Sequence, residues 1–179
     1  MNPMSRPRLA TVGYLLALTA CTQSYSPRRM PGPVPLDPGA VSISAPSVPG
    51  VPGFSSAIRM GLMVHLSGQV ALDSAANLVG TGDLGLQSRQ ALTNLLSLVR
   101  AARGLPGDVV KLTFYVKGLD AAAAHTVQEV SAELFPEQPA PAVTIVGVAA
   151  LPAPELLVAV DGVAVLRGEF PDRQRVGAR

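Results

Sequence analysis

Apolar and polar residues alternate along several stretches of the chain, and this alternation predicts where its strands lie. Residues 54–60 and 62–67 flank Gly61, so they predict a hairpin whose second strand continues through residues 68–72. Residues 109–116 predict a further strand. One face of that strand is expected to carry Val110, Leu112, Phe114 and Val116.

A second kind of pattern, a continuous apolar run, follows later in the chain. β-Branched residues crowd the segment 143–148, and prolines stand at Pro141 and Pro152 on either side. Such a run is typical of a buried strand. A last apolar run, residues 156–166, predicts the final strand.

Helical spacing of apolar residues appears in two other segments. Asp83 is a suitable N-cap for the first helix, and Gly104 with Pro106 ends it. The second helix is expected to begin at Asp120 and to run to about Phe135. The apolar stripes consist of Leu92, Leu95, Leu96, Val99 and Ala102 in the first helix, and of Val127, Val130 and Leu134 in the second.

The order of these elements is ββαβαββ. It predicts an α+β domain at residues 54–166, with two helices on one face of a mixed sheet. The chain has 179 residues, of which 48% are hydrophobic, and this suffices for one domain with a real core.

Charge is unevenly distributed, so the net charge of +2 for the whole chain is misleading. Residues 54–166 contain six basic and nine acidic side chains, a net charge of −3. The chain also has no tryptophan and few other aromatic residues. A basic stripe and a base-stacking platform are both missing, so nucleic-acid binding is disfavoured.

The N-terminus has the pattern of an export signal. Two arginines and no acid precede an apolar run from Leu9 to Ala20, which is too short for a hydrocarbon core that needs about 20 residues. The run ends in Leu18-Thr-Ala-Cys21, which resembles the lipobox of bacterial lipoproteins with Cys21 as the lipidated residue. Residues 1–20 are then the signal peptide. The alternative is an ordinary cleaved signal with an incidental cysteine.

The lipoprotein interpretation predicts an exported protein, anchored to the membrane through Cys21 and facing the periplasm. Thr22 rather than Asp follows Cys21, which resembles lipoproteins sorted to the outer membrane. From Thr22 to Gly53 the chain has eight prolines and no helical or strand periodicity, so residues 21–53 are expected to be a disordered tether. A PxxP-type recognition site is the alternative. Residues 167–179 are expected to be a disordered tail.

The sequence also contains two weak chemical motifs. Residues 80–85 match G-x-G-x-x-G, but a polar loop precedes them where a dinucleotide site needs a strand, so they are interpreted as a loop entering a helix. The chain has only two histidines, His65 and His125, which are too few for a metal site. His65 is either pocket-adjacent or structural, and His125 is expected to be solvated.

A hydrolytic set of Ser67, His65 and Asp161 can also be drawn, but no G-x-S-x-G elbow supports it. Asp161 ends an apolar run, so its carboxylate needs a partner if it is buried. The alternative is an aspartate at the edge of the sheet.

Six segments in the same order resemble the RidA (YjgF-like) family of imine deaminases across residues 54–166. They are Phe54-Ser-Ser-Ala-Ile, His65-Leu-Ser-Gly-Gln69, Arg89-Gln-Ala-Leu-Thr-Asn94, Asp108-Val-Val-Lys-Leu-Thr113, Val148-Ala-Ala-Leu-Pro152 and Pro154-Glu-Leu-Leu-Val-Ala-Val-Asp161. The resemblance implies a chorismate-mutase-like fold and a homotrimer with pockets between subunits. It also implies hydrolysis of 2-imino acids to 2-keto acids and ammonia, without a metal or an organic cofactor.

The resemblance assigns a pocket to particular residues. Ser67 and Gly68 match the family, whereas Phe54 replaces a tyrosine and Gln128 replaces an asparagine. Asp161 stands for the glutamate that orients water, which makes it the candidate catalytic residue. Val143 replaces the arginine that clamps the substrate carboxylate, and an apolar side chain cannot imitate that bidentate pair.

Two main hypotheses follow for function. The first is an envelope-tethered protein of this family with an altered pocket, which binds a small, neutral or more apolar molecule or acts through its surface as a scaffold. The alternative is an imine or enamine deaminase whose substrate lacks the usual carboxylate. A binding module with no occupied pocket is a third, minor possibility.

Overall fold

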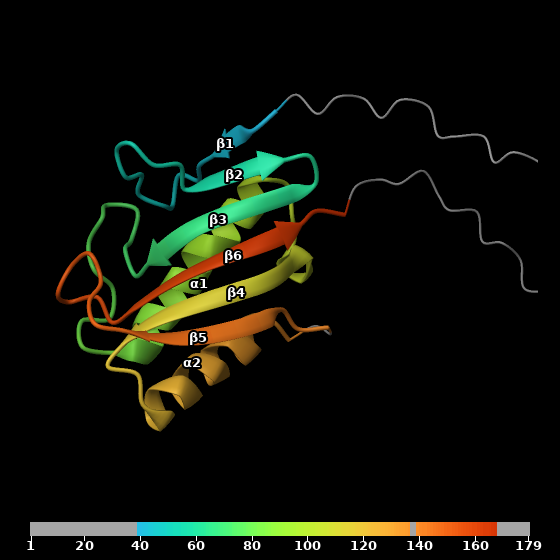
Figure 1. The fold of residues 1–179 in the computed structure, drawn as a ribbon. Coiled ribbons are helices and arrows are strands. Elements are labelled where there is room, and N and C mark those ends of the chain that lie inside the picture. The colour runs from blue at the N-terminus through green and yellow to red at the C-terminus, as the bar shows by residue number, and fades with distance from the viewer. Residues whose placement is uncertain (1–38, 137–138, 168–179) are drawn as a thin grey trace, which may run out of the picture. The chain divides into compact units, whose positions relative to one another are not determined.

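The computed structural model describes residues 39–136 and 139–167, which form a sheet and two α-helices (Figure 1). The strands are β1 (Val41–Ile43), β2 (Ala57–Met60), β3 (Met63–Val70), β4 (Val109–Lys117), β5 (Ala142–Val148) and β6 (Val158–Val165). The helices are α1 (Leu84–Ala101) and α2 (Ala121–Leu134), and a single 3-10 turn spans Pro106–Asp108. The predicted signal peptide, Cys21, most of the predicted tether and the tail beyond Arg167 lie outside the described residues.

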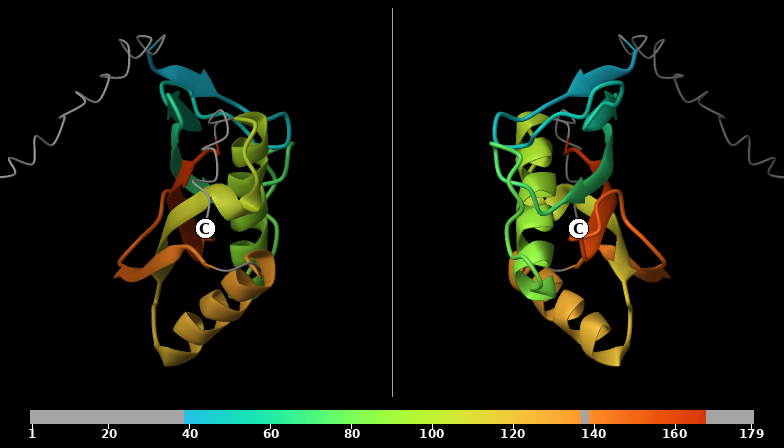
Figure 2. Two further views of the ribbon diagram at one scale, coloured as in Figure 1. Left: turned by 90° about the vertical axis from the view of Figure 1, so that its right-hand side faces the viewer. Right: turned by 90° about the vertical axis from the view of Figure 1, so that its left-hand side faces the viewer.

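The strands form one mixed sheet in the order β1-β2-β3-β6-β4-β5. Only β4 and β5 run parallel, because α2 connects them as a crossover, while the other neighbours are antiparallel. Figure 2 shows both helices on the same side of the sheet. The predicted α+β arrangement of ββαβαββ, with two helices on one face of a mixed sheet, is confirmed, and β1 is added at its start.

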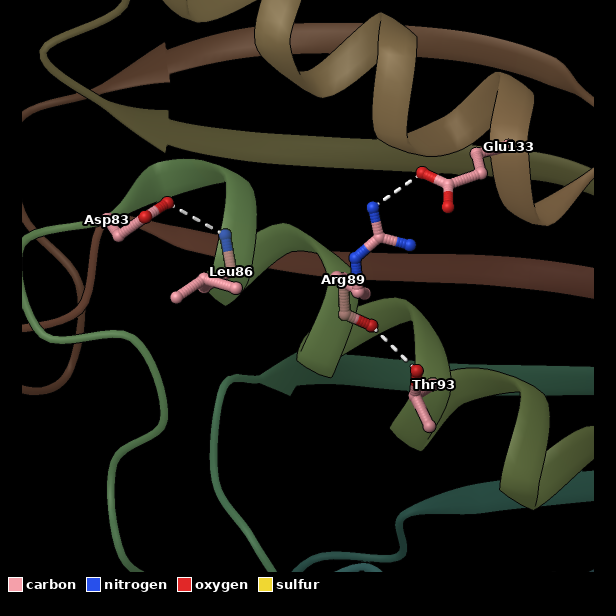
Figure 3. Close-up of polar contacts among 5 residues, drawn as sticks. All are labelled: Asp83, Leu86, Arg89, Thr93 and Glu133. Carbon is pink, nitrogen blue, oxygen red and sulfur yellow. Dashed lines mark hydrogen bonds and ion pairs between the residues drawn. The ribbon is translucent and has the colours of Figure 1, made fainter.

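Both helices begin where the sequence predicts, because an aspartate caps each of them. Asp83 accepts a hydrogen bond from the backbone N–H of Leu86 at 2.9 Å (Figure 3). Asp120 accepts one from the backbone N–H of Ala123 at 2.7 Å. Within the described residues, no helix is both long enough and apolar enough to span a lipid bilayer.

The core lies between the helices and the sheet face that they cover. Leu92, Leu95 and Leu98 of α1 and Phe114 of β4 are completely buried there. At the outer surface of the helix layer, Arg89 of α1 and Glu133 of α2 form an ion pair at 2.5 Å (Figure 3). The hydrogen bond from Arg89 holds the pKa of Glu133 below its ordinary range.

Strand β1 corrects the predicted start of the domain. Residues 41–43 pair with β2, and Ala45 and Val48 are buried in the core at 7% and 9% exposure. The expectation of a tether without strand structure through Gly53 is therefore wrong for this part. The proline-rich composition of this segment gives no local sign of β1. A strand of only three residues forms because it pairs with β2, and the local pattern does not show that pairing.

Two expectations for the strands were also wrong. Strand β5 is not the buried strand that was expected: it lies at the edge of the sheet, and Val143 and Val146 are 43% and 39% exposed. Val110 does not lie with Leu112 on the core face but is 45% exposed, because the pairing of β4 with β6 shifts between Val109 and Lys111. This irregularity turns Val109 inward instead.

Candidate functional site

A bulge in β3 builds one half of the candidate site. Leu66 pairs with Gly162 and Gln69 pairs with Val160, so Ser67 and Gly68 together stand opposite Asp161 alone. The Ser67 hydroxyl donates to the Ser56 carbonyl at 2.8 Å and accepts from the Gln69 amide at 3.1 Å. These bonds fix the bulge, where the strand register brings together three of the six predicted site residues, Ser67, Gly68 and Asp161.

Next to the bulge lies a cavity of about 360 Å³, which we call the Phe54 cavity. Phe54, Ser67 and Gly68 line it, together with Asn94 of α1 and Pro152. The Phe54 ring is 78% exposed, an unusual state for so large an apolar side chain. Asn94 in turn donates to the carbonyls of Val70 and Leu72, at 3.0 and 2.8 Å, and so holds the end of β3 in place.

The loop that carries Pro152 is held by a second buried amide of α1. Gln87 is completely buried, and its Nε2 donates to the carbonyls of Gly80 and Glu155, at 3.1 and 3.0 Å. Its Oε1 accepts from the Leu157 N–H at 2.8 Å. Every polar atom of this amide therefore serves to join two loops to the helix.

A larger cavity of about 520 Å³, which we call the α2–β5 cavity, lies between the second helix and the edge strand. Val127, Phe135 and Ser131 are its buried residues, whereas Gln128 and Val143 are exposed. Apart from Gln128 and Ser131, its described lining is apolar, and none of these side chains carries a charge. The position that resemblance assigns to arginine is therefore part of an apolar wall.

Asp161 lines neither cavity. It lies on the sheet face away from the helices, and its Oδ2 accepts a hydrogen bond from the Tyr115 hydroxyl at 2.8 Å. This bond to Asp161 is the main cause that raises the pKa of Tyr115 above its ordinary value of 10.0. Strand β6 runs between β3 and β4, so the alternative of an aspartate at the sheet edge is wrong.

The predicted pocket residues thus fall into two groups within one chain. Phe54, Ser67 and Gly68 lie on the β3 side, and Gln128 and Val143 lie on the β5 side. Strands β6 and β4 separate β3 from β5, which amounts to three strand spacings, or about 14 Å. One copy of the chain does not bring the two groups into one small-molecule pocket.

Over residues 39–136 and 139–167, the structure does not form a dinucleotide, metal or hydrolytic site from the weaker sequence motifs. Gly80 and Gly82 adopt positive φ in a loop that enters α1, as expected for residues 80–85. In the described part of the chain, no group of three metal-ligating side chains occurs. His65 is not hydrogen-bonded to Ser67 or Asp161 there, so the hydrolytic set is not formed, and the exposed His125 faces Glu129 at 3.4 Å.

Ser131 is a candidate site residue that the sequence reasoning missed. It follows Gln128 by three residues and Val127 by four, so it lies on the apolar stripe of α2. A serine at a position of helical apolar spacing was the available signal, because burying a hydroxyl is costly unless it has a partner.

Comparisons with known proteins agree with this fold. The family model described as endoribonuclease L-PSP matches residues 44–166. The 2-iminobutanoate/2-iminopropanoate deaminase of Dermatophagoides farinae is 35% identical over 111 residues, which are 62% of this chain and 84% of that protein. The protein with the same name from Escherichia coli K12 is 34% identical over 116 residues, 64% of this chain and 88% of that one.

Solved structures give the same result. RidA from an Antarctic Psychrobacter has 27% identity and a TM-score of 0.64, and the match covers 70% of this chain and 99% of that one. Escherichia coli TdcF, solved with bound serine, has 28% identity and a TM-score of 0.63, over 71% and 99% of the two chains. On its sequence and its fold, this chain belongs to the RidA (YjgF-like) family, whose model carries the description endoribonuclease L-PSP.

Proposed function

We propose that this protein hydrolyses a reactive imine, or its enamine tautomer, and that the substrate lacks a carboxylate. Two relatives in the same family are named for deamination of 2-iminobutanoate and 2-iminopropanoate. In such a reaction water adds to the C=N carbon, the C–N bond breaks, and a carbonyl compound and ammonia result. Atoms and electrons balance with water as the only co-reactant.

The observation that carries the proposal is that the described lining of the α2–β5 cavity around Val143 carries no charge. A carboxylate in this cavity would lose its hydration without gaining a charged partner, which is costly. An apolar imine has no such penalty and gains from contact with Val127, Val143 and Phe135. The amide of Gln128 can still donate and accept a hydrogen bond at the exposed edge of the cavity.

We further propose that the site is shared between copies of the chain in a homotrimer. The two groups of pocket residues lie about three strand spacings apart in one copy, so the Phe54 cavity of one copy would complete the α2–β5 cavity of the next. In this arrangement Asp161 would orient water from beside the Ser67–Gly68 bulge. Tyr115 would hold its carboxylate in place.

The test compares two imines with the full chain. One is generated from benzylamine by a flavin-dependent amine oxidase, and the other is generated from leucine by an amino-acid oxidase. We expect the wild type to accelerate hydrolysis of the benzylamine imine and to act much more weakly on the 2-imino acid. Val143→Arg is expected to reverse this preference, because a charge-assisted pair contributes several kcal/mol, or about a thousandfold in rate.

Wild-type activity on the 2-imino acid equal to that on the benzylamine imine would contradict the proposed substrate class. Inactivity of both the wild type and Val143→Arg on both imines would contradict the proposed enzymatic activity. It would favour the first hypothesis drawn from the sequence, a small-molecule-binding or scaffold protein. The domain's net charge of −3 between residues 54 and 166 still disfavours nucleic acid as a substrate.

For the location, we propose an exported lipoprotein anchored through Cys21, facing the periplasm from the outer membrane. The support is the sequence of residues 1–22 alone. Membrane fractions of a two-membrane bacterium that expresses the full chain are expected to hold the wild type. Cys21→Ser should move to the soluble periplasmic fraction, and its retention in the membrane would count against a lipid at this residue.

A further inference from the structure

Ser131 is a buried residue whose hydroxyl has no partner among the described residues. Its side chain lines the α2–β5 cavity, and the residue is only 8% exposed. The hydroxyl of Ser88 also lacks a partner, but that oxygen is sealed from solvent. The Ser131 oxygen is not sealed in this way, so it is open to the cavity.

Three other hydroxyls on the two helices do have hydrogen-bond partners among the described residues, unlike that of Ser131. Thr93 donates to the carbonyl of Arg89 at 2.8 Å, four residues earlier, which Figure 3 shows. Ser97 and Thr126 make the same kind of bond, at 2.9 and 3.1 Å. This backbone bond is the usual way in which a helical serine or threonine is satisfied. Ser131 does not make it, although its helix is regular from Ala121 to Leu134.

The surroundings of Ser131 restrict the chemistry of a ligand. Val127, Phe135 and Ile145 form apolar walls, and among the described lining residues Gln128 is the only other polar one. Ser131 and Gln128 are three residues apart on α2, so they are neighbours on one side of the helix. Each can donate and accept a hydrogen bond, and neither is charged.

We propose that Ser131 is a ligand-binding residue of the α2–β5 cavity and that it selects neutral molecules with a hydrogen-bonding group on an apolar body. An amide or ester carbonyl can accept from the hydroxyl, while the apolar body occupies the space between Val127 and Phe135. The inference rests on the proposed function in that it concerns the same site. It adds a determinant of specificity and a chemical class.

The experiment measures binding by the full chain, without turnover, in a ligand-observed NMR titration. The two probes are hexanamide and hexanoate, which share an apolar chain and differ in the charge of the head group. We expect the wild type to bind hexanamide at least fivefold more tightly than hexanoate. Ser131→Ala should weaken the binding of hexanamide about fivefold, the value of one neutral hydrogen bond, and leave hexanoate unchanged.

Thr126→Val is the matched control, because it removes a hydroxyl of the same helix that is already bonded to Ala122. It should leave both dissociation constants unchanged, and Ser131→Thr should restore the binding of hexanamide. Equal binding of hexanamide by the wild type and Ser131→Ala would overturn the inference, and so would tighter binding of hexanoate or no binding of either probe. Binding as expected without hydrolysis of any imine would instead contradict only the proposed deaminase.

Discussion

At the scale of residues, the carboxylate of Asp161 is tolerated in the middle of the sheet because the Tyr115 hydroxyl donates a hydrogen bond to it. The two side chains meet at 2.8 Å across neighbouring strands, on the face that the helices do not cover. Cross-strand pairs of this kind contribute to sheet stability as well as to the position of the polar group. This pair is therefore expected to matter for folding, whatever Asp161 does in a reaction.

The pair predicts a stability change at alkaline pH. The pKa of Tyr115 is raised above its ordinary value of 10.0, so the folded state holds this proton more tightly than the unfolded state. The contribution of the pair is complete below pH 10 and is lost as the pH rises through the raised pKa. Urea denaturation at pH 9 and pH 11 should show a steeper loss of unfolding free energy for the wild type than for Tyr115→Phe.

At pH 9 the same variant should be less stable than the wild type by about 1 kcal/mol, because a hydrogen bond to a charged group is lost. An identical dependence on pH in the two proteins would show that Tyr115 does not titrate as a partner of Asp161.

At the scale of elements, the hydrophobic pattern predicted both helices and every strand from β2 to β6. Periodicity and capping aspartates are local signals, and Asp83 and Asp120 cap their helices as expected. Strand β1 and the inward turn of Val109 could not be predicted in this way. Both depend on pairing with another strand, which the local pattern does not contain.

The prediction that β5 is buried was wrong for a related reason. Its β-branched run is typical of a strand covered on both faces, yet its place at the sheet edge is a property of strand order. The candidate site was predicted residue by residue through resemblance, but its division into two cavities also follows from strand order. Ser131 was missed because its burial against the cavity, without a hydrogen-bond partner among the described residues, is visible only in three dimensions.

The revised domain boundary makes a prediction about fragments. A fragment of residues 39–167 should be more stable than one of residues 54–167, because the shorter one lacks β1 and the buried side chains of Ala45 and Val48. Burial of these two small side chains and the pairing of β1 together suggest a loss of about 2–3 kcal/mol. Equal denaturation midpoints and slopes for the two fragments would restore the boundary at Phe54.

At the scale of the whole molecule, the sheet face without helices carries an exposed apolar patch. Met60, Met63 and Val165 are 54%, 43% and 40% exposed, and the strand registers place them side by side on β2, β3 and β6. An exposed apolar patch of this kind is typical of an interface. It fits the proposed association of copies, which would also bring the two cavities of neighbouring copies together.

A mixing experiment tests whether the two cavities form one site between copies. Phe54→Ala and Gln128→Ala should each impair every site of a homotrimer, since each alters one half. When the two inactive variants are unfolded, mixed in equal amounts and refolded, a site is intact if each copy supplies its unaltered half. Random assembly makes about a quarter of the sites intact, so about a quarter of the wild-type activity on the benzylamine imine should return.

The control carries both substitutions in one chain and is refolded with itself, where no intact site can form. A mixture no more active than the separate variants would mean that Phe54 and Gln128 do not serve one shared site. The same mixture also separates assembly from chemistry, because light scattering reports the mass of the refolded oligomer independently of turnover. A trimer without recovered activity would leave the interface intact and remove the shared site, whereas a wild-type chain that is monomeric and fully active would remove both.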